Sequence, residues 1–323
     1  MESSNLSTLR EEAAAAEDEE LSPLPPPPPP PSDSASASAF SPDSIPPRPA
    51  SRSLLQKYAP LDWSRFFDKE EDITIPGSND VFHVYMAGSD GPVVFCLHGG
   101  GYSGLSFALS ASKIKEKARV VAMDLRGHGK SSTENDSDLS IEMLSSLDEL
   151  YSYFPPFCSM GGSVAVHVAA RKVMPNITGL VVVDVVEVEW SVKGGPLRNV
   201  ESARLSVPST LKYDESKKCY TYRTPLEESE RYWKGWYEGL SDKFLSCPVP
   251  KLLLLAGTDR LDRALTIGQM QGKFQMVVVR HTGHAIQEDA PEEFASYILN
   301  FIGRNRIGPH GVEIPGLLRR SQQ

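Results

Sequence analysis

Five short, mostly apolar runs constrain the fold of this chain more than any other feature of its sequence. They are Pro92–Leu97, Ala118–Met123, Ile177–Val183, Lys251–Ala256 and Gln275–Val279. Such runs are typical of strands that are buried on both faces of a sheet. Because loop and helix patterns separate them, the sequence predicts an α/β fold with a mostly parallel, doubly wound sheet.

Three further patterns define the expected domain, residues 57–310. The segments Asp72–Ile75 and Val81–Tyr85 alternate apolar and polar side chains and predict an antiparallel hairpin ahead of the sheet. A helix from about Pro291 to Arg304, with proline in its first turn, closes the domain. Residues 187–246 are less periodic, and we interpret them as a reduced cap inserted into the domain.

The ends of the chain have a different composition. Residues 1–56 hold an acidic, alanine-rich segment and the proline run Pro25–Pro31, so they cannot bury enough apolar surface to offset the entropy of ordering. We expect a disordered N-terminal tail and a flexible C-terminal tail over residues 311–323. A proline run either docks an SH3- or WW-type partner or remains solvated.

Charge and cysteine content exclude several classes of function. The net charge of −9 and the pI of about 5.4 argue against a general binder of nucleic acid or of membrane surfaces. The four cysteines lack the paired spacing of metal ligands, the N-terminus has no apolar signal-peptide core, and no apolar stretch approaches the length of a membrane span. The expectation is a soluble protein of the cytoplasm, the nucleus or both, with reduced thiols.

The sequence Ser159-Met160-Gly161-Gly162 precedes a run of small and apolar residues with helical character. Serine at this position matches the second half of a nucleophile elbow, the sharp strand-to-helix turn of α/β-hydrolases. The first half differs, because Phe157 stands where the elbow has glycine and Pro155-Pro156 interrupt the expected strand. Ser159 is therefore either a nucleophile or the N-cap of the helix.

Acyl transfer also needs a base, an acid that orients the base, and donors for the oxyanion. The base is expected at His284, with His281 as its competitor. Asp184 and Asp259 each follow a strand and can supply the acid; from the residues alone Asp259, nearer to His284 in the chain, is the more usual choice. The backbones of Gly99, Gly100 and Gly101 and of Met160 are the expected source of oxyanion donors.

Several longer stretches resemble the protein phosphatase methylesterases, from about Asp62 to Arg306. They are Leu97–Ser103, Val121–Arg126, Ser159–His167, Val183–Glu187, Arg198–Arg204, Phe244–Leu253 and Gly257–Met276. The last is the most specific, because its segment Gly268–Met276 is not a general hydrolase motif. The resemblance implies an esterase without cofactor that demethylates the C-terminal leucine of the protein phosphatase 2A catalytic subunit. It also implies Ser159 as nucleophile, His284 as base and Asp184 as acid, ahead of Asp259.

Two stretches depart from the family pattern. The apolar strand that leads to the serine in the family is replaced by Tyr153–Cys158, and Glu187–Trp190 joins directly where the family has a longer insertion. We interpret both as excised segments, from splicing or from the gene model. Three functions follow: an active methylesterase, a general small-ester hydrolase, or a catalytically impaired form that binds the phosphatase.

Overall fold

The computed structural model describes residues 56–145, 161–171, 177–185, 198–258 and 261–308. These all belong to the second of the two units into which the chain divides, Ser51–Gln323. Several predictions lie outside the described residues: the two tails, the turn with Ser159 and Met160, Asp259, and the junction at Glu187–Trp190.

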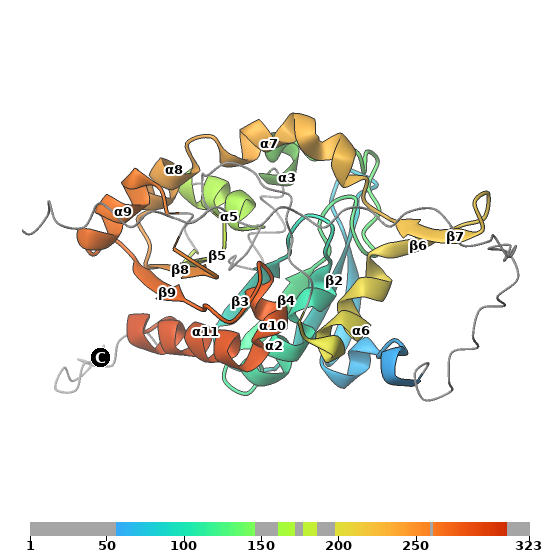
Figure 1. Ribbon diagram of the computed structural model, residues 1–323, viewed down its shortest axis with the longest axis horizontal. Coiled ribbons are helices and arrows are strands. Elements are labelled where there is room, and N and C mark those ends of the chain that lie inside the picture. The colour runs from blue at the N-terminus through green and yellow to red at the C-terminus, as the bar shows by residue number, and fades with distance from the viewer. Residues whose placement is uncertain (1–55, 146–160, 172–176, 186–197, 259–260, 309–323) are drawn as a thin grey trace, which may run out of the picture. The chain divides into compact units, whose positions relative to one another are not determined.

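The first sheet contains four strands in the order β1-β2-β4-β3 (Figure 1). The strands are β1 (Lys69–Thr74), β2 (Val81–Ala87), β3 (Val93–Leu97) and β4 (Arg119–Met123). β1 and β2 are antiparallel, with Asp72 opposite His83, which confirms the predicted hairpin. β3 and β4 run parallel, as their apolar sequences predict.

The second sheet has the order β5-β8-β9, and both of its strand pairs are parallel. Its strands are β5 (Leu180–Val183), β8 (Lys251–Leu255) and β9 (Gln275–Val278). Every residue of β5 and β8 is buried, which explains their continuous apolar sequences. Together the two sheets confirm the predicted α/β class with mostly parallel strands.

Helix α5 (Gly161–Ala170) packs on the ends of strands from both sheets. A Cβ atom on Gly161 would overlap the Cβ of Leu97, the last residue of β3. A Cβ on Gly162 would lie 3.2 Å from Cγ1 of Val182 in β5. The two glycines therefore let the start of α5 approach the carboxyl ends of β3 and β5 at the same time.

Helices cover both faces of the strands (Figure 1). On one face lie α2 (Ala108–Ile114), α10 (Ile286–Asp289) and α11 (Pro291–Asn305), whose bounds confirm the predicted closing helix. On the other face lies α5. Val94 and Cys96 of β3 belong to the core cluster of α2 and α11, whereas Phe95 and Leu97 belong to the cluster of α5. This alternation is what a doubly covered sheet requires, and each large side chain so buried contributes about 1.5–3 kcal/mol.

The described part of the predicted cap, residues 198–246, consists of short elements, which explains its weak periodicity. They are α6 (Val200–Ser209), β6 (Leu211–Asp214), β7 (Cys219–Tyr222), η4 (Leu226–Ser229), α7 (Glu230–Tyr237) and α8 (Leu240–Ser246). Trp236 links α7 to the rest of the domain, because its indole N–H donates to the carbonyl of Leu139 at 2.7 Å. Its own carbonyl accepts the hydroxyl of Ser163 in α5 at 2.7 Å.

The remaining described elements are η2 (Trp63–Arg65), η3 (Gly104–Phe107), α3 (Ile141–Ser145) and α9 (Arg263–Met270). None of the helices in the described ranges has the length and apolarity to cross a membrane. The described cysteines, Cys96, Cys219 and Cys247, carry free thiols.

Candidate active site

Asp184 and His284, which lie 100 positions apart in the chain, meet through a hydrogen bond. Asp184 directly follows β5, and His284 lies in the loop between β9 and α10. Nδ1 of His284 donates to Oδ2 of Asp184 at 2.9 Å. The side chain of Asp184 is 1% exposed and that of His284 is 35% exposed. The pair therefore has a buried acid behind an imidazole that solvent or a ligand can reach.

Backbone groups at the end of β8 and directly after it hold Asp184 in place. Oδ1 of Asp184 accepts the N–H of Ala256 at 2.9 Å, and the N–H of Asp184 donates to the carbonyl of Leu254 at 2.7 Å. Asp184 has φ +51°, the left-handed region that residues other than glycine seldom occupy. Such strain costs about 1 kcal/mol or more and is often found at functional sites.

The loop that carries His284 is anchored by Asp289 and Arg198. Oδ2 of Asp289 accepts the N–H of Gly283 at 2.7 Å, and Oδ1 accepts the N–H of Arg198 at 2.8 Å. The Arg198 guanidinium donates to the carbonyl of His281 at 2.9 Å. The exposed imidazole of His281 pairs with Glu293 at 3.0 Å, so of the two histidines His284 is the one that contacts Asp184. Sequence reasoning did not single out Asp289 or Arg198, because no local pattern marks the bonds that Arg198 makes with a loop more than 80 positions later in the chain.

Two buried histidines fix the glycine loop that follows β3. Nδ1 of His98 donates to the carbonyl of Gly99 at 2.7 Å, and its Nε2 accepts the N–H of Leu125 at 2.9 Å. Nδ1 of His128 donates to the carbonyl of Arg126 at 2.8 Å, and its Nε2 accepts the N–H of Gly101 at 3.0 Å. Each ring thus needs one donor and one acceptor nitrogen, which only the neutral imidazole provides.

Burial favours the same neutral state. It lowers the pKa of His128 to about 4 and, together with the neighbouring His128, lowers the pKa of His98 well below its usual value. Gly101 has φ +74°, which glycine adopts without strain. The N–H of Gly101, one of the predicted oxyanion donors, is therefore bonded to His128. This bond fixes the conformation of the loop.

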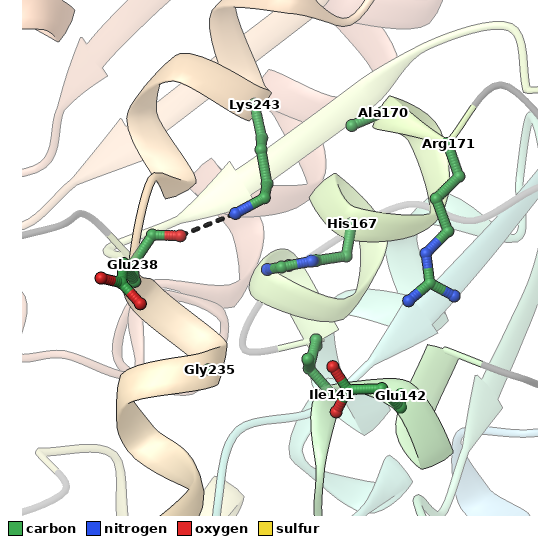
Figure 2. A pocket seen from close by; sticks show the side chains of 8 residues that line it. All are labelled: Ile141, Glu142, His167, Ala170, Arg171, Gly235, Glu238 and Lys243. Carbon is green, nitrogen blue, oxygen red and sulfur yellow. Dashed lines mark hydrogen bonds between the residues drawn. The ribbon is translucent and has the colours of Figure 1, made fainter.

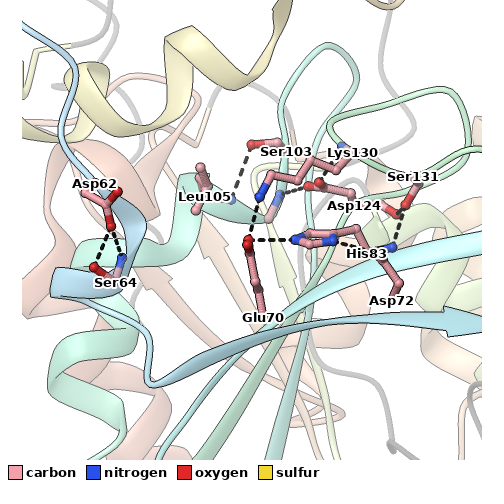
Figure 3. A network of polar contacts seen from close by, with 11 residues as sticks. Asp62, Ser64, Glu70, Asp72, His83, Ser103, Leu105, Asp124, Lys130 and Ser131 are labelled. Carbon is pink, nitrogen blue, oxygen red and sulfur yellow. Dashed lines mark hydrogen bonds and ion pairs between the residues drawn. The ribbon is translucent and has the colours of Figure 1, made fainter.

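Asp124, directly after β4, bonds to the segments that follow β3 and β4 (Figure 3). Its buried carboxylate accepts the N–H of Gly104 at 2.7 Å and the N–H of Lys130 at 2.8 Å. The Lys130 ammonium pairs with Glu70, which also contacts Nε2 of His83 at 3.0 Å (Figure 3). A polar network thus ties the loops after β3 and β4 to the edge hairpin.

The start of α5 lies at the glycine loop. The N–H of Gly161 donates to the carbonyl of His98 at 3.1 Å. Ser159 and Met160, immediately before Gly161, are outside the described residues, as is Asp259, the alternative acid. The described part of the chain contains no cluster of side chains that could hold a metal ion.

A cavity of about 500 Å³ lies between α3, α5, α7 and α8 (Figure 2). Its lining residues are Ile141, Glu142, His167, Ala170, Arg171, Gly235, Glu238 and Lys243. Burial, Lys243 and Arg171 lower the pKa of His167 to about 4. The lining shares no residue with the Asp184–His284 pair and offers no nucleophile beside a base, so it provides no group for acyl transfer.

The fold and the acid–histidine pair define a class, and the comparisons agree: the chain belongs to the alpha/beta hydrolase family, whose model matches residues 93–297. Within that class it belongs to the protein phosphatase methylesterase family. Protein phosphatase methylesterase 1 of Mus musculus is 39% identical, with 77% of this chain and 86% of the mouse protein covered. The probable protein phosphatase methylesterase 1 of Caenorhabditis elegans is 40% identical, with 81% and 83% covered. The chain is thus a member of an esterase family, as the resemblance predicted.

Solved structures share the fold at lower identity. A thioesterase domain from the curacin biosynthetic pathway has a TM-score of 0.58 at 20% identity and covers 72% of this chain and 99% of its own. An E-2-(acetamidomethylene)succinate hydrolase has a TM-score of 0.59 at 16% identity and covers 73% and 100%. At these identities the two structures show the shared architecture alone.

This chain is shorter than its relatives inside the aligned region. The alignment with the mouse protein extends over 332 positions but includes 77% of the 323 residues of this chain, about 249. The mouse protein therefore carries about 80 residues for which this chain has no counterpart.

Proposed function

We propose that this chain is a serine esterase that removes the methyl ester from the C-terminal leucine of the protein phosphatase 2A catalytic subunit. In this proposal Ser159 is the nucleophile, His284 is the general base and Asp184 orients the base. Ser159 attacks the ester carbonyl as His284 takes its proton, and His284 then returns the proton to the departing methoxide, so that methanol leaves. Water hydrolyses the acyl-enzyme by the same steps.

The hydrogen bond between Nδ1 of His284 and Oδ2 of Asp184, at 2.9 Å, carries this proposal. A carboxylate oxygen can only accept, so Nδ1 holds the proton and Nε2 keeps the lone pair that a general base requires. The second oxygen of Asp184 is occupied by the N–H of Ala256, so the carboxylate cannot rotate away from the imidazole.

Chain connectivity supports the assignment of Ser159. Ser159 precedes Gly161 by two positions, and the N–H of Gly161 donates to the carbonyl of His98 at 3.1 Å. We assign the oxyanion to backbone N–H groups of the loop with Gly99 and Gly100 and of Met160. Gly101 contributes the conformation of this loop, since its N–H donates to His128.

A fluorophosphonate probe and a methylated substrate together test the proposal. The wild-type protein is expected to be labelled at Ser159 and to release methanol from the methylated phosphatase catalytic subunit. Ser159→Ala should lose both reactions, while Ser296→Ala, on the exposed side of α11, should keep both. A folded wild-type protein that is not labelled would rule out the active enzyme. Activity on short esters without activity on the phosphatase would instead support a general esterase.

One observation favours a second candidate, a catalytically impaired form that binds the phosphatase. The residues that replace the expected strand before Ser159 include Pro155 and Pro156, and proline is excluded from central strands. In the described residues β3 ends the first sheet and β5 begins the second. This candidate predicts phosphatase binding without labelling of Ser159.

A further inference from the structure

The hairpin of β6 and β7 presents an uncovered aromatic face. Tyr213 lies opposite Tyr220, and Leu211 lies opposite Tyr222, so these four side chains share one face of the hairpin. Tyr213, Tyr220 and Tyr222 are 48%, 70% and 72% exposed. Large aromatic side chains gathered on one exposed surface are typical of a protein-binding site.

Local bonds within the hairpin hold it in shape. Oδ1 of Asp214 accepts the N–H of Ser216 at 2.9 Å and the N–H of Lys217 at 3.1 Å, which fixes the turn. Tyr213 and Tyr220 form an edge-to-face pair with ring centroids 5.3 Å apart. At the base, Nε of Arg223 donates to the carbonyl of Leu211 at 3.1 Å. A preorganised face loses little entropy when a partner binds.

The hairpin leads directly into the candidate active site. Thr224, two residues after β7, donates its hydroxyl to the carbonyl of Gly127 at 2.7 Å, in the turn that carries His128. Cδ1 of Leu226 lies 2.7 Å from the place of a Cβ on Gly101. A four-residue strand is on the order of 13 Å long. A protein whose tail reaches the glycine loop therefore has its folded body within range of the hairpin.

The charge around the aromatic face differs in sign from that of the chain as a whole. Residues 211–223 carry four basic side chains, Lys212, Lys217, Lys218 and Arg223, and two acidic ones, Asp214 and Glu215, in a chain of net charge −9. A partner surface with apolar groups bordered by acidic side chains would complement this hairpin.

We propose that the face of Leu211, Tyr213, Tyr220 and Tyr222 docks the folded body of the protein ester substrate, through an apolar patch bordered by acidic residues. This inference rests on the proposed function, because it assumes a protein as substrate. The tail alone supplies the ester to the site, whereas the hairpin supplies the contact that distinguishes the intact protein from a free peptide.

Two substrates with the same ester separate docking from chemistry. The double variant Tyr220→Ser/Tyr222→Ser should lower kcat/KM for the methylated phosphatase catalytic subunit about tenfold or more, since exposed aromatic anchors dominate such contacts. Its kcat/KM for a short C-terminal peptide methyl ester should change less than twofold. Tyr58→Ser, at a tyrosine that is 57% exposed elsewhere, is the matched control and should affect neither substrate. Equal loss on both substrates, or no loss on the protein, overturns the proposal.

A binding measurement keeps the inference separate from the proposed function. If the chain hydrolyses neither ester, immobilised phosphatase should still bind wild type at least tenfold more tightly than the double variant; that result supports docking and rejects the catalytic function. Absence of wild-type binding overturns docking.

Lys217→Glu/Lys218→Glu should slow the association with the phosphatase and reduce the salt dependence of the association rate. Self-association that the tyrosine variants abolish, measured by sedimentation, would identify a second copy as the occupant and overturn the proposal.

Discussion

Nε2 of His128 accepts the backbone N–H of Gly101 at 3.0 Å, so a buried side chain from the turn after β4 fixes the glycine loop after β3. The bond exists only while the imidazole is neutral, because a protonated ring has no acceptor nitrogen. Stability and the geometry of the loop therefore depend on the same proton.

Stability should fall as the pH drops from about 6.5 to about 4. Burial lowers the pKa of His128 to about 4 in the folded protein, so over this range the unfolded chain binds more protons than the folded one. The contribution of His128 to the free energy of unfolding is complete above pH 6.5. It is lost toward pH 4, at about 1.4 kcal/mol per pH unit. His98, whose pKa is also lowered, adds to it with the same sign.

Urea titrations at pH 7 and pH 5 measure this effect. His128→Gln keeps an acceptor for Gly101 but cannot titrate, so its stability should depend less on pH than that of wild type. His281→Gln, at an exposed histidine, is the control for the loss of one histidine side chain. Equal pH dependence in His128→Gln and wild type would contradict the assignment.

Gly161→Ala should destabilise the domain by about 3 kcal/mol, because the new methyl group would overlap the Cβ of Leu97 and force α5 away from β3. Gly303→Ala is the matched change in α11, where nothing lies within 4 Å of the added atom. It should stabilise the protein by about 0.5–1 kcal/mol through helix propensity. Chemical unfolding measures both, and a similar response of the two variants would show that α5 tolerates the displacement.

The apolar runs predicted the parallel strands well, because burial on both faces leaves a plain signal in the sequence. The start of β1 was not predictable in this way: Lys69–Glu71 belong to the strand although all three are charged. β1 pairs only with β2 in the described sheets and is mostly exposed, so charged residues are tolerated there.

The site was predictable only in part. The order of serine, acid and histidine along the chain restricted the acid to Asp184 or Asp259, but a sequence does not say which strand end meets the loop of His284. The bond from His128 to Gly101 and the anchoring of Gly283 by Asp289 were also missed. The first bond joins the loops after β3 and β4, which only the pairing of these strands brings together, and the second is a side-chain bond across six residues that marks no sequence pattern.

Glu288 should make the protein less stable as the pH rises. The carboxyl is fully buried and accepts the hydroxyl of Ser206 at 3.1 Å, and burial raises its pKa to about 7. The folded protein thus binds this proton more tightly than the unfolded chain, and the contribution is complete below about pH 4.5 and lost as the pH rises through 7.

Glu288→Gln removes this titration. At pH 8.5 the variant should be more stable than wild type by about 2 kcal/mol, and near pH 5 the two should be similar. Glu292→Gln, at an exposed carboxylate in the first turn of α11, controls for the change in net charge. Thermal melts at both pH values provide the comparison, and a variant that is less stable than wild type at pH 8.5 would exclude the raised pKa.

Asp289→Asn should weaken the anchor of the loop that carries His284, although Asp289 is not expected to contact the substrate. Asparagine keeps one acceptor oxygen, so the bond to Gly283 or the bond to Arg198 is lost, and His284 becomes less well positioned. We expect kcat for ester hydrolysis to fall about tenfold with little change in KM. Asp242→Asn, at an exposed carboxylate of α8, should have wild-type kinetics. A rise in KM alone would mean that Asp289 acts in binding.

Asp184→Asn should reduce activity far more than Asp289→Asn. The amide can present its NH₂ to Nδ1 of His284, which selects the tautomer with the proton on Nε2 and leaves no lone pair for the hydroxyl of Ser159. The expected loss is about 10⁴-fold in kcat, with a parallel loss in the rate of fluorophosphonate labelling. Asp259→Asn tests the alternative acid under the same conditions. If Asp259→Asn causes the larger loss, the acid is Asp259, and the contact of Asp184 with His284 is structural.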